Sequence, residues 1–81
     1  MMDDRFTSLE ELKDSIEIGL DIECYINKQR YYIGWSQGKR VIAKCPDVEG
    51  IHFETLEDML DYVIEGKKLK DSWKDIQIRS M

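Results

Sequence analysis

The spacing of apolar residues changes from a helical to a strand period near Gly19, and this change restricts the chain to an α+β fold. Before Gly19, one apolar stripe recurs at helical spacing, formed by Leu9, Leu12 and Ile16. After it, apolar residues alternate with polar ones, in the order Ile22, Cys24 and Ile26. Alternation of this kind is typical of a half-buried strand.

The predicted first helix carries start and stop signals at its two ends. Thr7 and Ser8 each precede a glutamate by three residues, Glu10 and Glu11, which is the capping-box spacing. Gly19 ends the helix, because glycine adopts the left-handed conformation that closes many helices.

An antiparallel meander follows, with three predicted strands at 20–27, 30–36 and 39–45. The first connection is a tight turn at 27–30, favoured by Asn27, and the second is Gln37-Gly38. In the second strand, alternation places Tyr31, Ile33 and Trp35 on the core face. In the third, alternation places Val41, Ala43 and Cys45 on one face and Arg40, Ile42 and Lys44 on the other.

The second half of the chain is predicted to add a short strand and two helices. Pro46 stops the third strand, a loop covers 47–50, and residues 51–53 form a short fourth strand. Thr55 caps a helix that extends to Gly66, with an apolar stripe of Leu56, Met59, Leu60, Val63 and Ile64. A turn or short helix near 70–74 packs Trp73 on the core, and Ile76 and Ile78 also fit a terminal extended segment.

These elements predict a single α+β domain over residues 1–81. It is a three- to four-stranded antiparallel meander with helices packed on one face, in the order α-β-β-β-(β)-α-α. One face of such a sheet is left to solvent or to a partner, unless the first helix or the C-terminal tail covers it. By the alternation above, that face carries Glu23 and a candidate interaction surface of Tyr25, Arg30, Tyr32, Arg40, Ile42 and Lys44.

Composition favours a cytoplasmic protein. No apolar run approaches the roughly 20 residues that span a bilayer, so no membrane association is expected. The first residues include Asp3, Asp4 and Arg5 without the apolar segment of a secretory signal. Cys24 and Cys45 lie in apolar-alternating segments and form no close pair, which predicts two buried free thiols.

Charge is distributed in blocks along a chain of net charge −5. Residues 31–46 hold three bases and no acid, whereas 47–66 hold seven acids and no Lys or Arg. Pairing between neighbouring elements explains this pattern most simply. One alternative is nucleic-acid binding by the basic, aromatic meander of residues 28–44. Another is an acidic mimic of nucleic acid built on a helix bearing Glu57, Asp58, Asp61 and Glu65.

No constellation of residues predicts an enzyme, a cofactor or a metal site. Cys45, Asp47 and His52 could be arranged as a nucleophile with its base, but so short a chain leaves little room for a substrate cleft. Cys24, Cys45 and His52 lack the closely spaced ligand pairs of structural zinc sites. The N-terminal carboxylates lack the spacing of a calcium loop.

The last third of the chain resembles small uncharacterised proteins of low-GC Gram-positive bacteria and their mobile elements. The resemblance lies in Phe53 to Asp61 and in Gly66 to Trp73. It implies a bacterial cytosolic accessory protein and transfers no functional residue. The resulting hypothesis is a non-catalytic protein-binding or regulatory module that engages another protein, or a second copy of itself as a homodimer.

Overall fold

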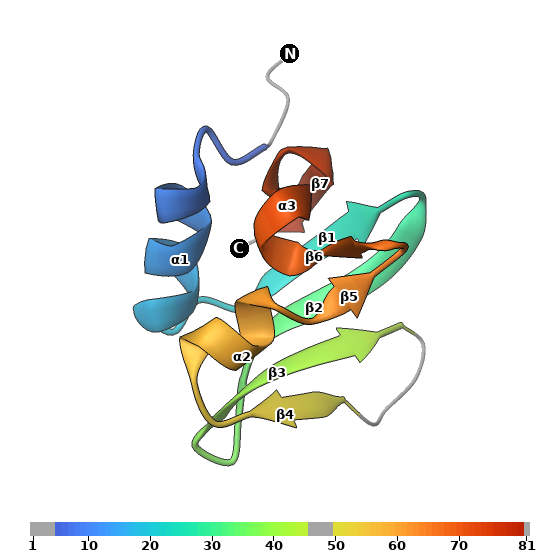
Figure 1. Ribbon diagram of the computed structural model, residues 1–81. Helices are drawn as coiled ribbons and strands as arrows, with labels where there is room; N and C mark the ends of the chain where they lie inside the picture. Colours follow the sequence, from blue (N-terminus) through green and yellow to red (C-terminus); the bar gives the residue numbers. More distant parts are fainter. Residues whose placement is uncertain (1–4, 46–49, 81) are drawn as a thin grey trace.

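A computed structural model describes residues 5–45 and 50–80, and its centre is a five-stranded antiparallel sheet (Figure 1). The strand order is β4-β3-β2-β1-β7. The strands are β1 (Ile22–Ile26), β2 (Gln29–Ser36), β3 (Lys39–Lys44), β4 (Ile51–Phe53) and β7 (Ile76–Ser80). The predicted α+β class, with an antiparallel meander, is confirmed. Of the predicted loop at 47–50, only Gly50 belongs to the described residues.

Helix α1 (Leu9–Glu17) forms where the apolar stripe predicts it. Ser8 is the N-cap, and its side chain accepts a hydrogen bond from the backbone N–H of Glu11 at 3.2 Å. The Glu11 carboxylate in turn accepts from the N–H of Thr7 at 2.8 Å. The first bond satisfies a donor in the first turn that has no partner within the helix, and the second ties the residue before the N-cap to that turn.

Two-residue turns set the register of the meander. Asn27 and Lys28 connect β1 to β2, and Gln37 and Gly38 connect β2 to β3, all with positive φ. Such turns match the twist of paired strands. The first turn is shorter than predicted, because Gln29 already belongs to β2.

The sheet has more strands than the sequence predicted, because the C-terminal segment joins it. Strand β7 pairs antiparallel with β1, placing Ile76 opposite Ile26 and Ile78 opposite Cys24. The spacing of Ile76 and Ile78 predicts an extended segment here but does not identify its partner strand. Strand β1 thereby becomes an interior strand, and β7 and β4 become the two edges.

The predicted second helix is too long. Helix α2 (Leu56–Leu60) begins at Thr55, whose hydroxyl accepts from the N–H of Asp58 at 3.1 Å, but it ends at Leu60. The chain then forms a hairpin of β5 (Val63–Ile64) and β6 (Lys67–Lys68). Glu65 and Gly66 form its turn with φ values of 52° and 87°. Gly66 is therefore a turn residue and not a helix stop.

The remaining segment is α3 (Leu69–Ser72) followed by a single 3₁₀ turn, η1 (Trp73–Asp75). This confirms the short helix predicted near residues 70–74. Trp73 is half-buried against the core, also as predicted. No helix in the described ranges, 5–45 and 50–80, has both the length and the apolarity needed to cross a membrane.

All three helices contribute to one core on one side of the sheet (Figure 1). Its buried members include Leu12 and Ile16 of α1, Met59 and Leu60 of α2, Leu69 of α3, and the sheet residues Ile22, Cys24, Ile26, Tyr31, Ile33, Ile42, Phe53 and Ile76. Across the sheet, register places Ile22, Ile33, Ile42 and Ile51 in one row. This row defines the covered face.

Candidate functional site: the open face of the sheet

The opposite side of the sheet carries no helix or hairpin within the described part of the chain. We call this side the open face; in the three central strands it comprises Glu23, Tyr25, Arg30, Tyr32, Gly34, Ser36, Lys39, Val41 and Ala43. His52 of β4 and Gln77 of β7 extend it at the two edges. Neither the first helix nor the described tail covers it.

The predicted interaction surface is divided between the two faces. Tyr25, Arg30 and Tyr32 lie together on the open face, as predicted. Arg40, Ile42 and Lys44 lie on the covered face, so their predicted placement is wrong. The reason is register. The two-residue turn after Ser36 places Trp35 opposite Arg40 and Ile33 opposite Ile42, and opposite residues of antiparallel strands share a face.

Arg40 connects elements inside the fold. Its guanidinium donates to both carboxylate oxygens of Glu17 at 3.0 and 2.7 Å, which ties β3 to the end of α1. The guanidinium carbon also lies 4.6 Å from the centre of the Trp35 ring, within the range of a cation–π contact. The Trp35 indole N–H donates to the backbone carbonyl of Ile16 at 2.6 Å. Arg40 and Trp35 together anchor α1 to the sheet.

The other two displaced residues have different environments. Ile42 is 3% exposed in the core, between Ile33 and Ile51. Lys44 is exposed beside Tyr31 on the covered side, near the end of β3. Neither residue can belong to a surface formed by Tyr25 and Tyr32.

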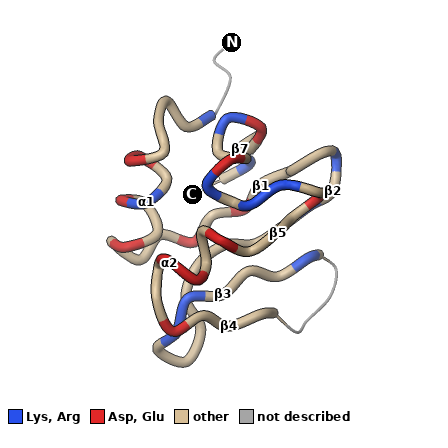
Figure 2. The backbone as a smooth tube through the Cα atoms, in the orientation of Figure 1, with Lys and Arg blue, Asp and Glu red and all other residues tan. Residues whose placement is uncertain are grey.

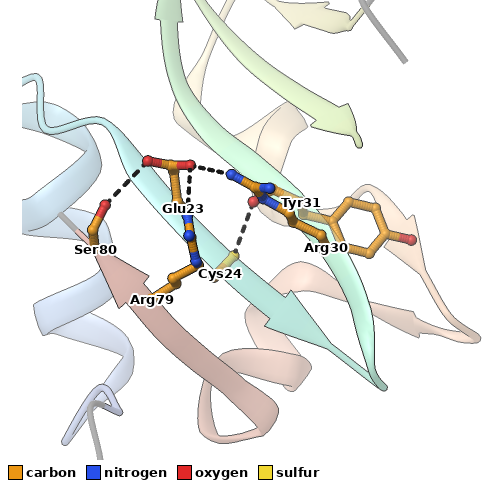
Figure 3. Close-up of polar contacts among 6 residues, drawn as sticks. All are labelled: Glu23, Cys24, Arg30, Tyr31, Arg79 and Ser80. Atoms are coloured by element: carbon orange, nitrogen blue, oxygen red, sulfur yellow. Dashed lines mark hydrogen bonds and ion pairs between the residues drawn. The ribbon is translucent and has the colours of Figure 1, made fainter. Parts of the chain in front are cut away.

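A polar network occupies the open face at β1, β2 and β7 (Figure 3). The Glu23 carboxylate accepts from the Arg30 guanidinium at 2.6 Å, from the Ser80 hydroxyl at 3.2 Å and from Arg79 at 3.5 Å. The hydrogen bond from Arg30, followed by that from Ser80, holds the pKa of Glu23 below its usual range. The network fixes the Arg30 side chain over the sheet.

Tyr32 lies flat over its own strand. Its hydroxyl donates to Asp21 Oδ1 at 2.7 Å, and burial followed by this bond raises the pKa of Tyr32. A side chain at Gly34 would overlap the Tyr32 ring, so glycine leaves the space in which the ring lies. Tyr32 is thus a half-buried aromatic held in one orientation.

Sequence reasoning missed two apolar members of the open face, Val41 and Ala43. Val41 is only 4% exposed, yet it lies opposite Gly34 and outside the main core cluster. Gly50, at the entry to β4, lies close against both residues. The signal that could have located them is the same two-residue turn that moves Ile42 to the core.

The cations of the open face are matched by acids. Arg30 and Arg79 pair with Glu23, and Lys39 pairs with Glu54 at 2.7 Å. Along the described chain, blue and red segments are interspersed rather than gathered in one basic strip (Figure 2). These contacts agree with the simplest explanation of the charge blocks, which is that acids and bases of neighbouring elements form ion pairs.

The residues considered for chemistry are not assembled. His52 lies opposite Val41. Cys45 follows Val41 by four residues, so His52 and Cys45 are separated by about 13 Å along the strand direction. Asp47 lies outside the described residues. No cluster of three or more potential metal ligands occurs in the ranges 5–45 and 50–80.

The two cysteines are free, as predicted, but only one is fully buried. Cys24 is 0% exposed, and its thiol lies 3.7 Å from the backbone carbonyl of Tyr31 (Figure 3). Burial raises the pKa of the Cys24 thiol to about 12. Cys45 is half-buried, which corrects the prediction for that residue.

Comparison with protein-family models, curated proteins and solved structures gives no match for this chain. The resemblance of its last third to small Gram-positive proteins therefore stays a prediction. The function has to be argued from the residues of the open face.

Proposed function

We propose that this chain is a non-catalytic protein-binding module that engages another protein, or a second copy of itself, through the open face. The observation that carries the proposal is a sheet face that no described helix covers, with two half-buried aromatic side chains on it, Tyr25 and Tyr32. The Tyr32 ring is held in place by the hydrogen bond from its hydroxyl to Asp21. Aromatic residues and arginine supply much of the binding energy in protein interfaces. Side chains that are already ordered lose less conformational entropy on binding.

Charge pairing supports a protein over a nucleic acid as the partner. Nucleic-acid binding depends on cations that neutralise phosphates. On the open face Arg30, Lys39 and Arg79 each have a carboxylate within 3.5 Å, and the whole chain has a net charge of −5. The acidic-mimic alternative loses its helix, since Glu65 lies in the β5–β6 turn and α2 ends at Leu60.

The test compares Tyr32→Ala with Ile18→Ala, a substitution of an exposed apolar residue at the end of α1. Sedimentation and co-purification are measured for both variants and the wild type, with circular dichroism as the check of folding. Tyr32→Ala should stay folded and lose association, while Ile18→Ala should behave as wild type. Equal association by both variants would contradict a role for the open face.

A further inference from the structure

A groove separate from the centre of the open face lies where the β1–β2 turn, the β5–β6 hairpin and the start of β7 meet. The two turns lie side by side in Figure 1, and Asn27 of one donates to Glu65 of the other at 3.4 Å. The groove has a volume of about 810 Å³. That volume falls in the range of pockets that hold small organic molecules.

The groove has a floor that is mainly apolar. Ile26 and Ile64 line it and are 2% and 3% exposed. Ser72 also lines it, and its hydroxyl donates to the carbonyl of Lys68 at 3.1 Å. The one polar side chain among these buried residues therefore already has a partner, and the floor suits an apolar group.

The rim of the groove carries more positive than negative charge. Three cations line it, Arg5, Lys28 and Lys67, against two carboxylates, Glu65 and Asp75. Both carboxylates already accept hydrogen bonds or ion pairs. Asp75 pairs with Lys67 at 3.3 Å, and Glu65 accepts from the Tyr31 hydroxyl at 2.7 Å.

Lys28 is the cation best placed to meet a ligand. It projects from the β1–β2 turn at a φ of 66°. Among residues 5–45 and 50–80, no carboxylate lies within ion-pair distance of its ammonium group. This local positive excess occurs on a chain of net charge −5, so it is not a consequence of overall composition.

We propose that this groove binds a small organic anion with an apolar body. The apolar part would cover Ile26 and Ile64, and the anionic group would lie at the cationic rim beside Lys28. Charge complementarity selects an anion, and the volume selects a molecule of small-ligand size. The groove meets the open face at its edge, where Tyr25 and Gln77 line it, but Tyr32 and Val41 do not line it. Effects at Tyr32 and Val41 therefore distinguish the protein-binding role from binding in the groove.

The probe is 1-anilinonaphthalene-8-sulfonate, an aromatic sulfonate whose fluorescence rises in apolar sites. Titration of the intact chain should saturate at one probe per molecule and weaken as salt is added. Lys28→Gln should lower the affinity about three- to tenfold, and Lys28→Arg should keep it. Lys70→Gln is the control, because Lys70 pairs with Asp61 outside the groove.

Two further measurements separate this site from binding to a loosened core. Circular dichroism and urea midpoints should be equal for Lys28→Gln and the wild type. Amide and methyl shifts should change at Ile26, Ile64 and Ser72 and not at Tyr32 or Val41. Binding that does not saturate, that is equal in Lys28→Gln and wild type, or that shifts Tyr32 or Val41 would overturn the proposal.

Discussion

At the scale of single residues, the open face depends on a close contact between Tyr32 and Gly34. The Tyr32 ring occupies the space that a side chain at residue 34 would need, and its hydroxyl reaches Asp21. Gly34 has no positive φ, so its requirement is steric and not conformational. A residue two positions along the strand therefore determines where the aromatic ring lies.

A double-mutant cycle tests this contact. Gly34→Ala alone should lower the free energy of unfolding by about 1–2 kcal/mol, because the new methyl group displaces the ring. In a Tyr32→Ala background the same change should cost less than about 0.5 kcal/mol. Urea unfolding of the four proteins measures the coupling. Equal costs in the two backgrounds would show that the ring lies elsewhere.

The Cys24 thiol provides a second residue-scale prediction, on pH dependence. Its pKa is raised to about 12 in the folded chain, whereas an unfolded cysteine titrates near 8.5. The unfolded state therefore loses a proton first, so the stabilisation is complete below about pH 8.5 and declines as the pH rises. From pH 8.5 to 10 the free energy of unfolding should fall by roughly 1–2 kcal/mol through this group.

Cys24→Ala isolates that contribution. Its free energy of unfolding should decline less steeply between pH 8.5 and 10 than that of the wild type, even though the variant is less stable overall. Urea denaturation at a series of pH values measures both slopes. Identical slopes for the two proteins would mean that Cys24 is not buried from solvent.

At the scale of elements, the β5–β6 hairpin is where sequence pattern and structure differ most. Leu56, Met59, Leu60, Val63 and Ile64 fit a helical stripe, but only the first three lie in α2. Val63 is 56% exposed, and Ile64 reaches the core from a strand. The spacing of apolar residues could not distinguish one long helix from a short helix followed by a hairpin. Glu65-Gly66 supplies a two-residue turn as readily as a helix end, and local β-branched residues favour the hairpin.

Leu60→Ala and Val63→Ala distinguish the hairpin from a continuous helix. Leu60 is 3% exposed, so its truncation should cost about 2–4 kcal/mol through lost burial and a cavity. Val63→Ala should cost less than about 1 kcal/mol, because most of that side chain is in water. Urea midpoints rank the two variants. Similar, large costs at both residues would restore the helix to Gly66.

The third strand shows the other limit of prediction from sequence. Apolar residues occur in both of its alternating sets, so alternation alone does not determine which set faces the core. The predicted Gln37-Gly38 turn already required Ile42 to face Ile33. Local sequence pattern was enough to predict the first helix, the helix caps, the meander and half of the candidate surface. Local pattern could not predict the strand partner of Ile76–Ser80, because its pairing with β1 joins residues that are far apart in the chain.

At the scale of the whole molecule, the chain places all described helices on one side of a five-stranded sheet and leaves the other side without any. The side without described helices has a fixed aromatic ring, Tyr32, and matched charges, while the groove near Lys28 has a local excess of cations. The two surfaces have different chemistry and so predict different ligands. A protein partner suits the open face, and a small organic anion suits the groove.

Site-specific photo-crosslinking tests the central claim, that the open face is the partner-binding surface, most directly. A benzoylphenylalanine placed at Tyr32 replaces one aromatic residue with another, and the matched position is Ile18, which is 72% exposed at the end of α1. Irradiation in cells that express the full chain should give a discrete adduct, with a partner or a second copy, from position 32 and none from position 18. Adducts from position 18 alone, or equally from both positions, would contradict the account.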